Sequence, residues 1–318
     1  MGIINYKILQ VEAEPIEPGG IVLTNNFKTI ADFMGDAPLL VTNNGALITN
    51  DSAKNDTRGN GALDLQGSTG KNSATQAATG VSSVILRGSR NKASGDNSVV
   101  LNGFSTNATG DYSTASGYNS NATQDHATAI GYACTSSGLY SLTHGFLNHA
   151  TSTASSAIGY QNQASTSYSV ATGRNSTTRQ LASITNASGS FASSGDAQHE
   201  VFTVFATTTT ASPFPLQYFD DGLFNWNMMQ IMVQISAFNV TDSKGAAYIL
   251  KGAARGSNLQ GFTVIGSTTK ETWEDAEMVN CDASNFYAHP TGIRFDVTGL
   301  ANKTINWTAT WHITYSCV

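Results

Sequence analysis

The chain has 318 residues, room for two or three domains, and only 12% of them carry a charge, about half the share of an ordinary globular protein. The net charge of −6 comes with no basic cluster, which argues against nucleic acid as a partner. No stretch is long and apolar enough to cross a bilayer, so we expect no membrane insertion. Three scattered cysteines, Cys134, Cys281 and Cys317, are too few for a disulfide framework and fit assembly in a reducing compartment.

The first 60 residues show short, separate patterns. Apolar residues between positions 3 and 11 are spaced as in a strand, and an acidic loop with prolines follows. Phe27, Ile30, Ala31 and Met34 recur at helical spacing and predict a short helix over 25–34. Two apolar stretches, 39–42 and 46–49, flank Asn43-Asn44-Gly45 and predict a small hairpin. We expect region 1–60 to attach the chain to a larger assembly and to help it oligomerise; equally open is that its first strand simply begins the fold.

Residues 61–195 contain a repeat with a period of 14. Its most regular position is a glycine that returns without a slip in six successive units: Gly103, Gly117, Gly131, Gly145, Gly159 and Gly173. The next residue is aromatic in five of these units, and a small residue stands five positions after each glycine. Because several positions keep one phase, a whole structural unit repeats.

A period of 14 fits two short strands joined by two tight turns. Stacked units would form parallel ladders about 4.8 Å apart, which makes a β-roll. Between residues 99 and 173 only Asp111 and Asp125 are charged, as expected where like residues stack and like charges repel. The aromatic column, with Ile130 and Leu142, leaves an apolar stripe on one roll. Self-association about a threefold axis would cover it, so we expect a homotrimer.

Three of the units resemble a known repeat. The segments Ala127-Thr-Ala-Ile-Gly131, Ser155-Ser-Ala-Ile-Gly159 and Ser169-Val-Ala-Thr-Gly173 resemble the YadA-type head repeat of trimeric autotransporter adhesins. This resemblance implies a left-handed parallel β-roll in a trimer, and the repeat is similar to segments of bacteriophage tail fibres. Residues 58–66 and 74–80 look like the lead-in of the phage versions. The resemblance covers roughly a third of the chain and concerns the architecture more than the ligand.

An adhesin of this kind on a bacterial surface needs a secretory signal and a C-terminal membrane anchor. The sequence shows neither pattern. We therefore expect a protein that is assembled in the host cytoplasm and displayed on the exterior of a virus particle.

Beyond residue 195, tryptophan, methionine and alternating apolar residues appear. Six segments have the pattern of strands: 201–206, 231–238, 247–251, 262–265, 293–297 and 305–316. Several strands joined by loops over residues 198–318 predict an antiparallel β-sandwich of jelly-roll type. The expected fold class is therefore all-β, with a trimeric parallel β-roll followed by this sandwich and preceded by the short N-terminal anchor and helix.

No nucleophile motif, phosphate loop, dinucleotide fingerprint or zinc spacing occurs, so we expect neither catalysis nor a cofactor. The acidic residues that could hydrolyse a glycan fit solvated loop charge better. They are Asp220, Asp221, Glu271, Glu274, Asp275 and Glu277. Ligand contact is expected in loops at the tip of the C-terminal domain, where aromatic rings can stack on sugars. The candidates are Tyr218, Phe219, Trp226, Asn285, Tyr287 and His289.

Together these patterns predict a non-enzymatic, homotrimeric virion fibre resembling phage tail fibres. Its N-terminus would bind other virion proteins, and its C-terminal domain would bind a glycan or protein on the host surface. Two alternatives remain open: a fragment of a bacterial trimeric adhesin, and a tail spike that degrades polysaccharide.

Overall fold

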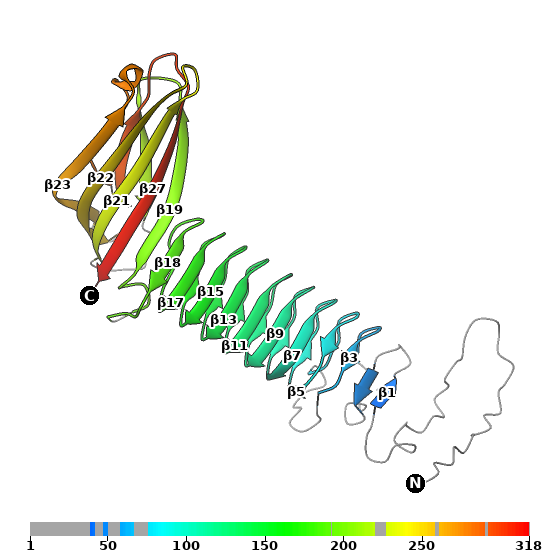
Figure 1. Cartoon of the computed structure of the whole chain (residues 1–318). Helices are drawn as coiled ribbons and strands as arrows, with labels where there is room; N and C mark the ends of the chain where they lie inside the picture. The colour runs from blue at the N-terminus through cyan, green and yellow to red at the C-terminus, as the bar shows by residue number, and fades with distance from the viewer. Residues whose placement is uncertain are drawn as a thin grey trace, which may run out of the picture.

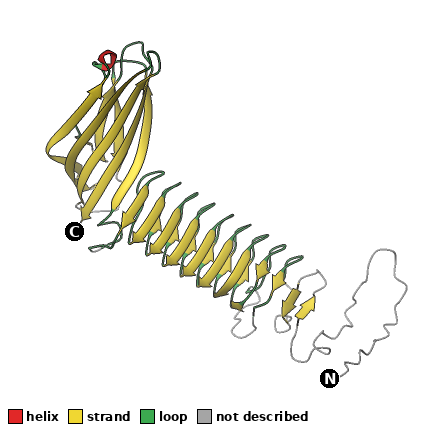
Figure 2. Cartoon of the chain, in the orientation of Figure 1, coloured by secondary structure: helices red, strands yellow, loops and turns green. Residues whose placement is uncertain are grey.

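A computed structural model describes residues 39–41, 47–49, 58–66, 76–191, 193–219, 227–257, 261–289 and 292–317. It shows a long column of short strands that ends in a broader domain with long strands (Figure 1). The described residues are almost entirely strand and turn (Figure 2). Their one helical turn, η2 (Ala276–Met278), lies at the far end of the broad domain. The predicted helix over 25–34 falls outside the described residues.

The column is a β-solenoid of about 7 turns over residues 84–187. One ladder, called the long-strand face below because most of its strands have four to six residues, contains β4 (Val84–Ile85), β5 (Gly88–Ser89), β7 (Val99–Phe104), β9 (Thr114–Tyr118), β11 (Thr128–Tyr132), β13 (Leu142–Phe146), β15 (Ser156–Tyr160), β17 (Val170–Arg174) and β18 (Ile184–Ala187). The short strands of the column are β6 (Lys92–Ala93), β8 (Asn107–Ala108), β10 (Asn121–Ala122), β12 (Thr135–Ser136), β14 (His149–Ala150) and β16 (Gln163–Ala164). All neighbouring turns pair in parallel, and Gly131 lies between Gly117 and Gly145. The predicted roll of 14-residue units is confirmed.

The interior of the solenoid is filled by small side chains. Alanines from the long and short strands point inward and are fully buried: Ala108, Ala115, Ala122, Ala129, Ala150, Ala157, Ala164 and Ala171. Serines such as Ser141 and Ser155 fill the next inward column. Methyl and hydroxymethyl groups let the two ladders of one turn approach closely, so each chain has a thin core of its own.

The repeated glycine is required by the stacking of the turns. At Gly131 φ is +130°, and a Cβ there would overlap the carbonyl oxygen of Gly145 in the next turn. The glycine carbonyls are satisfied by a polar residue three positions after the glycine of the preceding turn. Thr106 Oγ1 donates to Gly117 O at 2.6 Å, and Asn148 Nδ2 donates to Gly159 O at 2.7 Å. Close approach of backbone to backbone therefore excludes any side chain at this position.

Aspartates stand on successive turns, so the expectation that like charges avoid adjacent rungs is wrong here. Asp111 Oδ1 accepts the backbone N–H of Asp96 at 2.8 Å, and Asp125 Oδ1 accepts that of Asp111 at 2.9 Å. Each carboxylate thus satisfies a turn amide of its neighbour. Charge-assisted hydrogen bonds to exposed carboxylates offset the screened repulsion between them.

The N-terminal edge of the column is closed by separate contacts. Strands β1 (Leu39–Val41) and β2 (Leu47–Thr49) form the predicted antiparallel hairpin, although its turn, Asn43 to Gly45, lies outside the described residues. β2 pairs in parallel with β3 (Leu63–Asp64), which pairs with β4. Arg58 and Asp64 form a buried ion pair at 3.3 Å beneath the first turns.

The C-terminal domain is a sandwich of two antiparallel sheets. The first contains β19 (His199–Thr208), β27 (Ile305–Cys317), β21 (Asn227–Asn239), β22 (Lys244–Ser257) and β23 (Gly261–Glu274), in that spatial order. The second contains β20 (Pro213–Phe219), β26 (Gly292–Thr298), β24 (Asp282–Ala283) and β25 (Tyr287–His289). Trp311 packs against the rings of Phe202, Phe286 and Phe295 between the sheets. β18 pairs with β19, so the sheet of long strands continues from the solenoid into the sandwich.

The topology of the sandwich matches a jelly roll only in its first and last strands. β19 pairs with β27 in one sheet and β20 pairs with β26 in the other, as when a two-stranded ribbon wraps around a core. β21, β22 and β23 instead form a simple meander. All six predicted strands are present. β20 was not predicted because Pro213 and Pro215 interrupt its pattern, and its place at a sheet edge is where proline is tolerated.

Candidate functional site

Three of the acidic residues considered for glycan hydrolysis, Glu271, Asp275 and Glu277, are held by separate partners. Lys251 Nζ lies 2.5 Å from Glu271, and Lys244 Nζ lies 3.6 Å from Glu277. Asp275 accepts the backbone N–H of Gly245. Asp220 and Asp221 fall outside the described residues. Within the described ranges, no group of three or more His, Cys, Asp or Glu side chains could hold a metal ion, and no helix has the length and apolarity to cross a membrane.

The two stretches that supplied the binding candidates come together in the structure. β26 lies between β20 and β25, so Tyr218 and Ala288 both pair with Ile293. Phe219 and His289 both pair with Gly292 at the end of the same strands. Residues about 70 positions apart in sequence therefore meet at one end of the second sheet, on opposite sides of β26. Trp226 lies outside the described residues.

Tyr218, Phe219, Tyr287 and His289 do not lie at the free tip of the sandwich, where the sequence analysis placed them. β19 leaves the solenoid at His199 and reaches the free end at Thr208, where Gly299 lies against Thr208. β20 begins at Pro213 near this end and runs back toward the solenoid, so its last pair, Phe219 with Gly292, lies on the side of the junction. The prediction of a tip location is wrong because β20 was taken for a loop. Ligand binding by these residues stays a prediction.

The candidate side chains next to and in β25 are only partly available. Asn285 is exposed, while its neighbour Phe286 is buried in the core of the sandwich. The Tyr287 hydroxyl donates to Asp296 Oδ1 at 2.7 Å. Partial burial and this hydrogen bond raise the pKa of Tyr287 above its usual value. At neutral pH Tyr287 therefore presents a neutral, anchored phenol.

The free end of the sandwich consists of short polar turns that the sequence analysis did not select for ligand binding. Lys303 Nζ binds Asp242 Oδ1 at 2.8 Å, and Asn239 Nδ2 binds the other oxygen of that carboxylate at 2.9 Å. Val240 and Val279, in two of these turns, are exposed. The turns carry no aromatic residue, the signal on which the sequence prediction relied.

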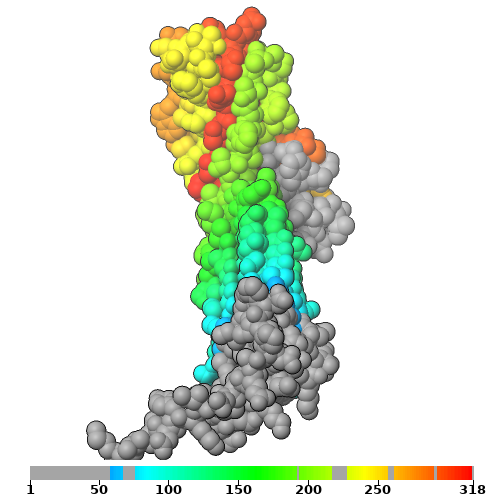
Figure 3. Space-filling model, turned by 90° about the vertical axis from the view of Figure 1, so that its right-hand side faces the viewer, coloured from blue at the N-terminus to red at the C-terminus, as the bar shows by residue number. Residues whose placement is uncertain are grey.

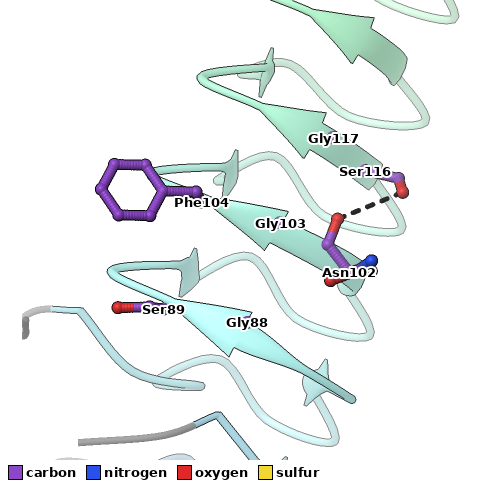
Figure 4. Close-up of a pocket in the computed structure, with 7 residues that line it drawn as sticks. All are labelled: Gly88, Ser89, Asn102, Gly103, Phe104, Ser116 and Gly117. Carbon is purple, nitrogen blue, oxygen red and sulfur yellow. Dashed lines mark hydrogen bonds between the residues drawn. The ribbon is translucent and has the colours of Figure 1, made fainter. Parts of the chain in front are cut away.

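A trough of about 410 Å³ opens on the long-strand face of the first solenoid turns. Its floor is the backbone of Gly88, Gly103 and Gly117 (Figure 4). Phe104 points to one side of this floor, and Asn102 points to the other, where its carbonyl oxygen accepts a hydrogen bond from Ser116 Oγ at 3.2 Å. An amide, hydroxyls and a ring edge around a backbone floor are groups that suit a polyhydroxylated ligand.

The trough exists because the repeat is irregular at this point. Gly88 and Gly103 are 15 residues apart, and the pairing of β7 with β9 shifts register between Val100 and Gly103. This β-bulge exposes Asn102. In the next three turns the position equivalent to Ser116 is occupied by larger residues beside the glycine column: Ile130, His144 and Ile158.

The aromatic residues after the glycines form a continuous ladder. Its rings stack at centroid distances between 4.8 and 5.5 Å in the order Phe104, Tyr118, Tyr132, Phe146, Tyr160. Arg90 covers the first ring and Arg174 the last, at 5.1 and 5.4 Å. Arg174, which breaks the aromatic series in sequence, therefore caps it by a cation–π contact. Since the ring faces cover one another, the ladder offers ring edges and hydroxyls rather than a stacking platform for sugars.

Comparison with known proteins identifies the repeat. Residues 108–133 and 150–176 match the YadA head domain repeat, so the class of the solenoid is that of YadA-type head repeats, as the sequence resemblance indicated. No curated protein matches the chain.

Among solved structures, the tailspike protein gp49 of Acinetobacter baumannii bacteriophage Fri1, a capsular polysaccharide depolymerase, is 10% identical with a TM-score of 0.22, over 83% of this chain and 50% of that one. The tailspike protein of Acinetobacter baumannii phage AM24 is 8% identical with a TM-score of 0.21, over 74% of this chain and 52% of that one. The chain thus spans about half the length of each, and TM-scores this low establish no common fold.

Proposed function

We propose that this protein is a homotrimeric attachment fibre of a virus particle. In this proposal the solenoid is the shaft, residues 1–60 bind other virion proteins, and the sandwich contacts a glycan or protein on the host surface. The observation that carries the proposal is the uninterrupted solenoid of YadA-type head repeats, a repeat named for an adhesin. A rigid column that holds a sandwich away from its base is suited to presenting a binding surface at a distance.

The surface of the solenoid supports self-association. Along the long-strand face, Tyr118, Tyr132 and Tyr160 expose 47, 45 and 40% of their area, and Ile158 exposes 37%. A contiguous apolar stripe of this length is unusual on a monomer. Association about an axis parallel to the column would cover the same stripe on every copy.

We also propose that attachment occurs without cleavage of the ligand. Glycoside hydrolysis needs two carboxyl groups facing one glycosidic bond at a separation of about 5 to 9.5 Å. In the described part of the sandwich, Glu271, Glu277 and Asp275 each bind a different lysine or backbone amide. A depolymerase would release new reducing ends from host polysaccharide, and their detection would contradict this part of the proposal.

Two experiments test the fibre. Light scattering on the purified chain at micromolar concentration should give the mass of three chains, and a well-folded monomer would overturn the trimer. Immunogold labelling of particles should then place the protein on their exterior. Labelling of a bacterial surface instead, together with a secretory signal encoded upstream, would favour a cellular adhesin. Removal of residues 198–318 should leave a trimeric rod that no longer adsorbs to the host.

A further inference from the structure

A second pocket lies on the outer face of the larger sheet of the sandwich. Its volume is about 280 Å³. It is lined by His199, Gln230, Ile231, Met232, Lys251, Gly252, His312 and Thr314. Figure 3 shows this face of the molecule, with β27 between β19 and β21. None of these residues belongs to the trough or to the candidates around β26.

Strand pairing brings the lining side chains into two rows. In one row, Met232 pairs with His312 on one side and with Lys251 on the other. In the next row, Thr314 pairs with both His199 and Gln230. These side chains face outward because the residues that alternate with them, such as Trp311 and Ile313, are fully buried.

A β-bulge shapes the pocket. The pairing of β22 with β23 shifts register between Lys251 and Ala253, and Gly252 lies at the shift. Gly252 itself faces inward: it pairs with the buried Ile231, and a Cβ on it would meet the Phe286 ring in the core. Bulges of this kind bend a strand and redirect its side chains, which fits a hollow on an otherwise regular sheet.

The polar groups around the pocket are mostly donors. The rings of His199 and His312 stack with centroids 5.9 Å apart. Lys251 supplies an ammonium group, Gln230 an amide and Thr314 a hydroxyl. Glu271 supplies a carboxylate that binds Lys251 at 2.5 Å. β21 contributes no titratable group, since its lining residues are Gln230, Ile231 and Met232.

We propose that this pocket binds a carboxylate-bearing sugar unit of an acidic glycan. The two imidazoles and the lysine suit the carboxylate, Gln230 and Thr314 suit ring hydroxyls, and the Met232 side chain suits the C–H face of a sugar. The volume exceeds the space that a simple carboxylate ion fills. This inference rests on the proposed attachment function, for which it names the class of ligand.

The proposal predicts tighter binding in acid. Partial burial and the neighbouring His199 lower the pKa of His312, so this ring is neutral at pH 7. Lys251 and Glu271 carry opposite charges that cancel. A bound carboxylate lies near Glu271, and protonation of His312 compensates for that repulsion. Affinity should therefore rise by about tenfold between about pH 7.5 and about pH 5.5.

The test is calorimetric titration of the full-length protein with D-glucuronate and with D-glucose at these two pH values. Glucuronate should bind at least about tenfold more tightly than glucose, and more tightly at the lower pH. Lys251→Gln and His312→Gln should each weaken glucuronate binding by about tenfold. Lys303→Gln is the matched control, since Lys303 forms a similar exposed pair with Asp242 at the other end of the sandwich. His144→Gln, an exposed histidine of the solenoid, is the second control.

Several results would overturn the proposal. They are equal binding of the two sugars, no heat with millimolar glucuronate, and glucuronate binding that survives both pocket variants. Acetate that binds as tightly as glucuronate would contradict a sugar site. Measuring mass and host adsorption on the same samples distinguishes failure of the pocket proposal from failure of the fibre proposal. A monomer that binds glucuronate contradicts only the fibre, and an adsorbing trimer that ignores glucuronate contradicts only the pocket.

Discussion

The solenoid and the sandwich are both built of strands, yet their interiors are opposite. In the solenoid the inward positions hold alanine and serine, whereas the largest buried side chains of the sandwich include Trp307, Trp311, Tyr248 and Phe295. The spacing of the layers explains the difference. Facing sheets of a sandwich pack about 10 Å apart and need large side chains, while a turn of 14 residues leaves room only for small ones. The stability of the solenoid should therefore be sensitive to enlarged inward side chains, and that of the sandwich to truncated ones.

The largest effect is expected from Gly131→Ala in the solenoid. A methyl group at this position, where φ is +130°, would overlap the carbonyl oxygen of Gly145, so we expect a loss of about 4 kcal/mol. The control is Gly245→Ala, where the nearest atom to a new Cβ is the Ala237 carbonyl oxygen at 3.8 Å and the change should stay within about 1 kcal/mol. Denaturation followed by circular dichroism measures both. Equal losses would refute the role given to the stacked glycines.

Trp311→Ala should destabilise the sandwich by about 4 kcal/mol, because it removes a ring packed between Phe202, Phe286 and Phe295. Trp273→Ala serves as control, since Trp273 is 52% exposed, and should change stability by less than about 1 kcal/mol. Fluorescence is a selective probe because all four tryptophans follow residue 225. A fluorescence midpoint that moves equally in both variants would contradict the assigned packing.

The junction between the two regions should be sensitive at Glu200. This buried carboxylate accepts the backbone N–H groups of Arg179 and Gln180 at 2.9 and 3.1 Å and the hydroxyl of Tyr315 at 2.9 Å. Glu200→Ala leaves these donors unsatisfied, so we expect a loss of about 3 kcal/mol and faster hydrogen exchange in β18. Glu277→Ala, at an exposed ion pair, should change stability by less than about 1 kcal/mol. Unchanged exchange in β18 would argue against a sealing role for Glu200.

Enlarging a side chain tests the solenoid from the other direction. Ala129→Leu adds three carbons to a fully buried position and should cost about 2 kcal/mol. Its control is the adjacent outward position, Thr128→Leu, because Leu142 already occupies the equivalent place in the next turn. Thermal denaturation of the two variants should separate them clearly. If the outward variant were the less stable one, the assignment of the two faces would be reversed.

The smallest effect is expected from alkaline pH and concerns the sandwich. Burial is the main cause that raises the pKa of Cys281 from 9.0 to about 11. The folded thiol keeps its proton while the unfolded one loses it, so stability should fall as pH rises from about 9 to about 11, by at most about 2 kcal/mol from this group. Cys281→Val should flatten this part of the stability profile. The buried Cys134 thiol of the solenoid, whose pKa burial also raises, offers the matching variant, Cys134→Asn.

The solenoid was predictable from sequence because its contacts are local. Each residue of β11 pairs with the residue 14 positions away, as Ala129 does with Ala115 and Thr143, so the period in the sequence is the register of the sheet. The inward alanines and the glycine column follow from that register. The cap formed by Arg174 was missed because in sequence it is only an interruption of the aromatic series.

The sandwich was predictable only in part. Alternation in the segment from Ile305 to Tyr315 defines a strand and its buried face from sequence alone. The neighbours of that strand cannot be read from its own pattern, because β27 pairs with residues 66 to 115 positions away in β19 and β21. For the same reason no sequence pattern could show that Tyr218 and His289 flank one strand near the junction, or that His199 and His312 stack on one face.

By itself, therefore, the sequence determined the repeat, the parallel roll with its thin core, and the presence of most strands in the C-terminal domain. Those properties arise from backbone geometry and from side-chain periodicity over one turn or one strand. Only the tertiary structure decided which loops form the free end, where the candidate residues lie, and which side chains meet in the two pockets. Both pockets lie at β-bulges, where extra residues in one strand break the regular spacing that sequence patterns report.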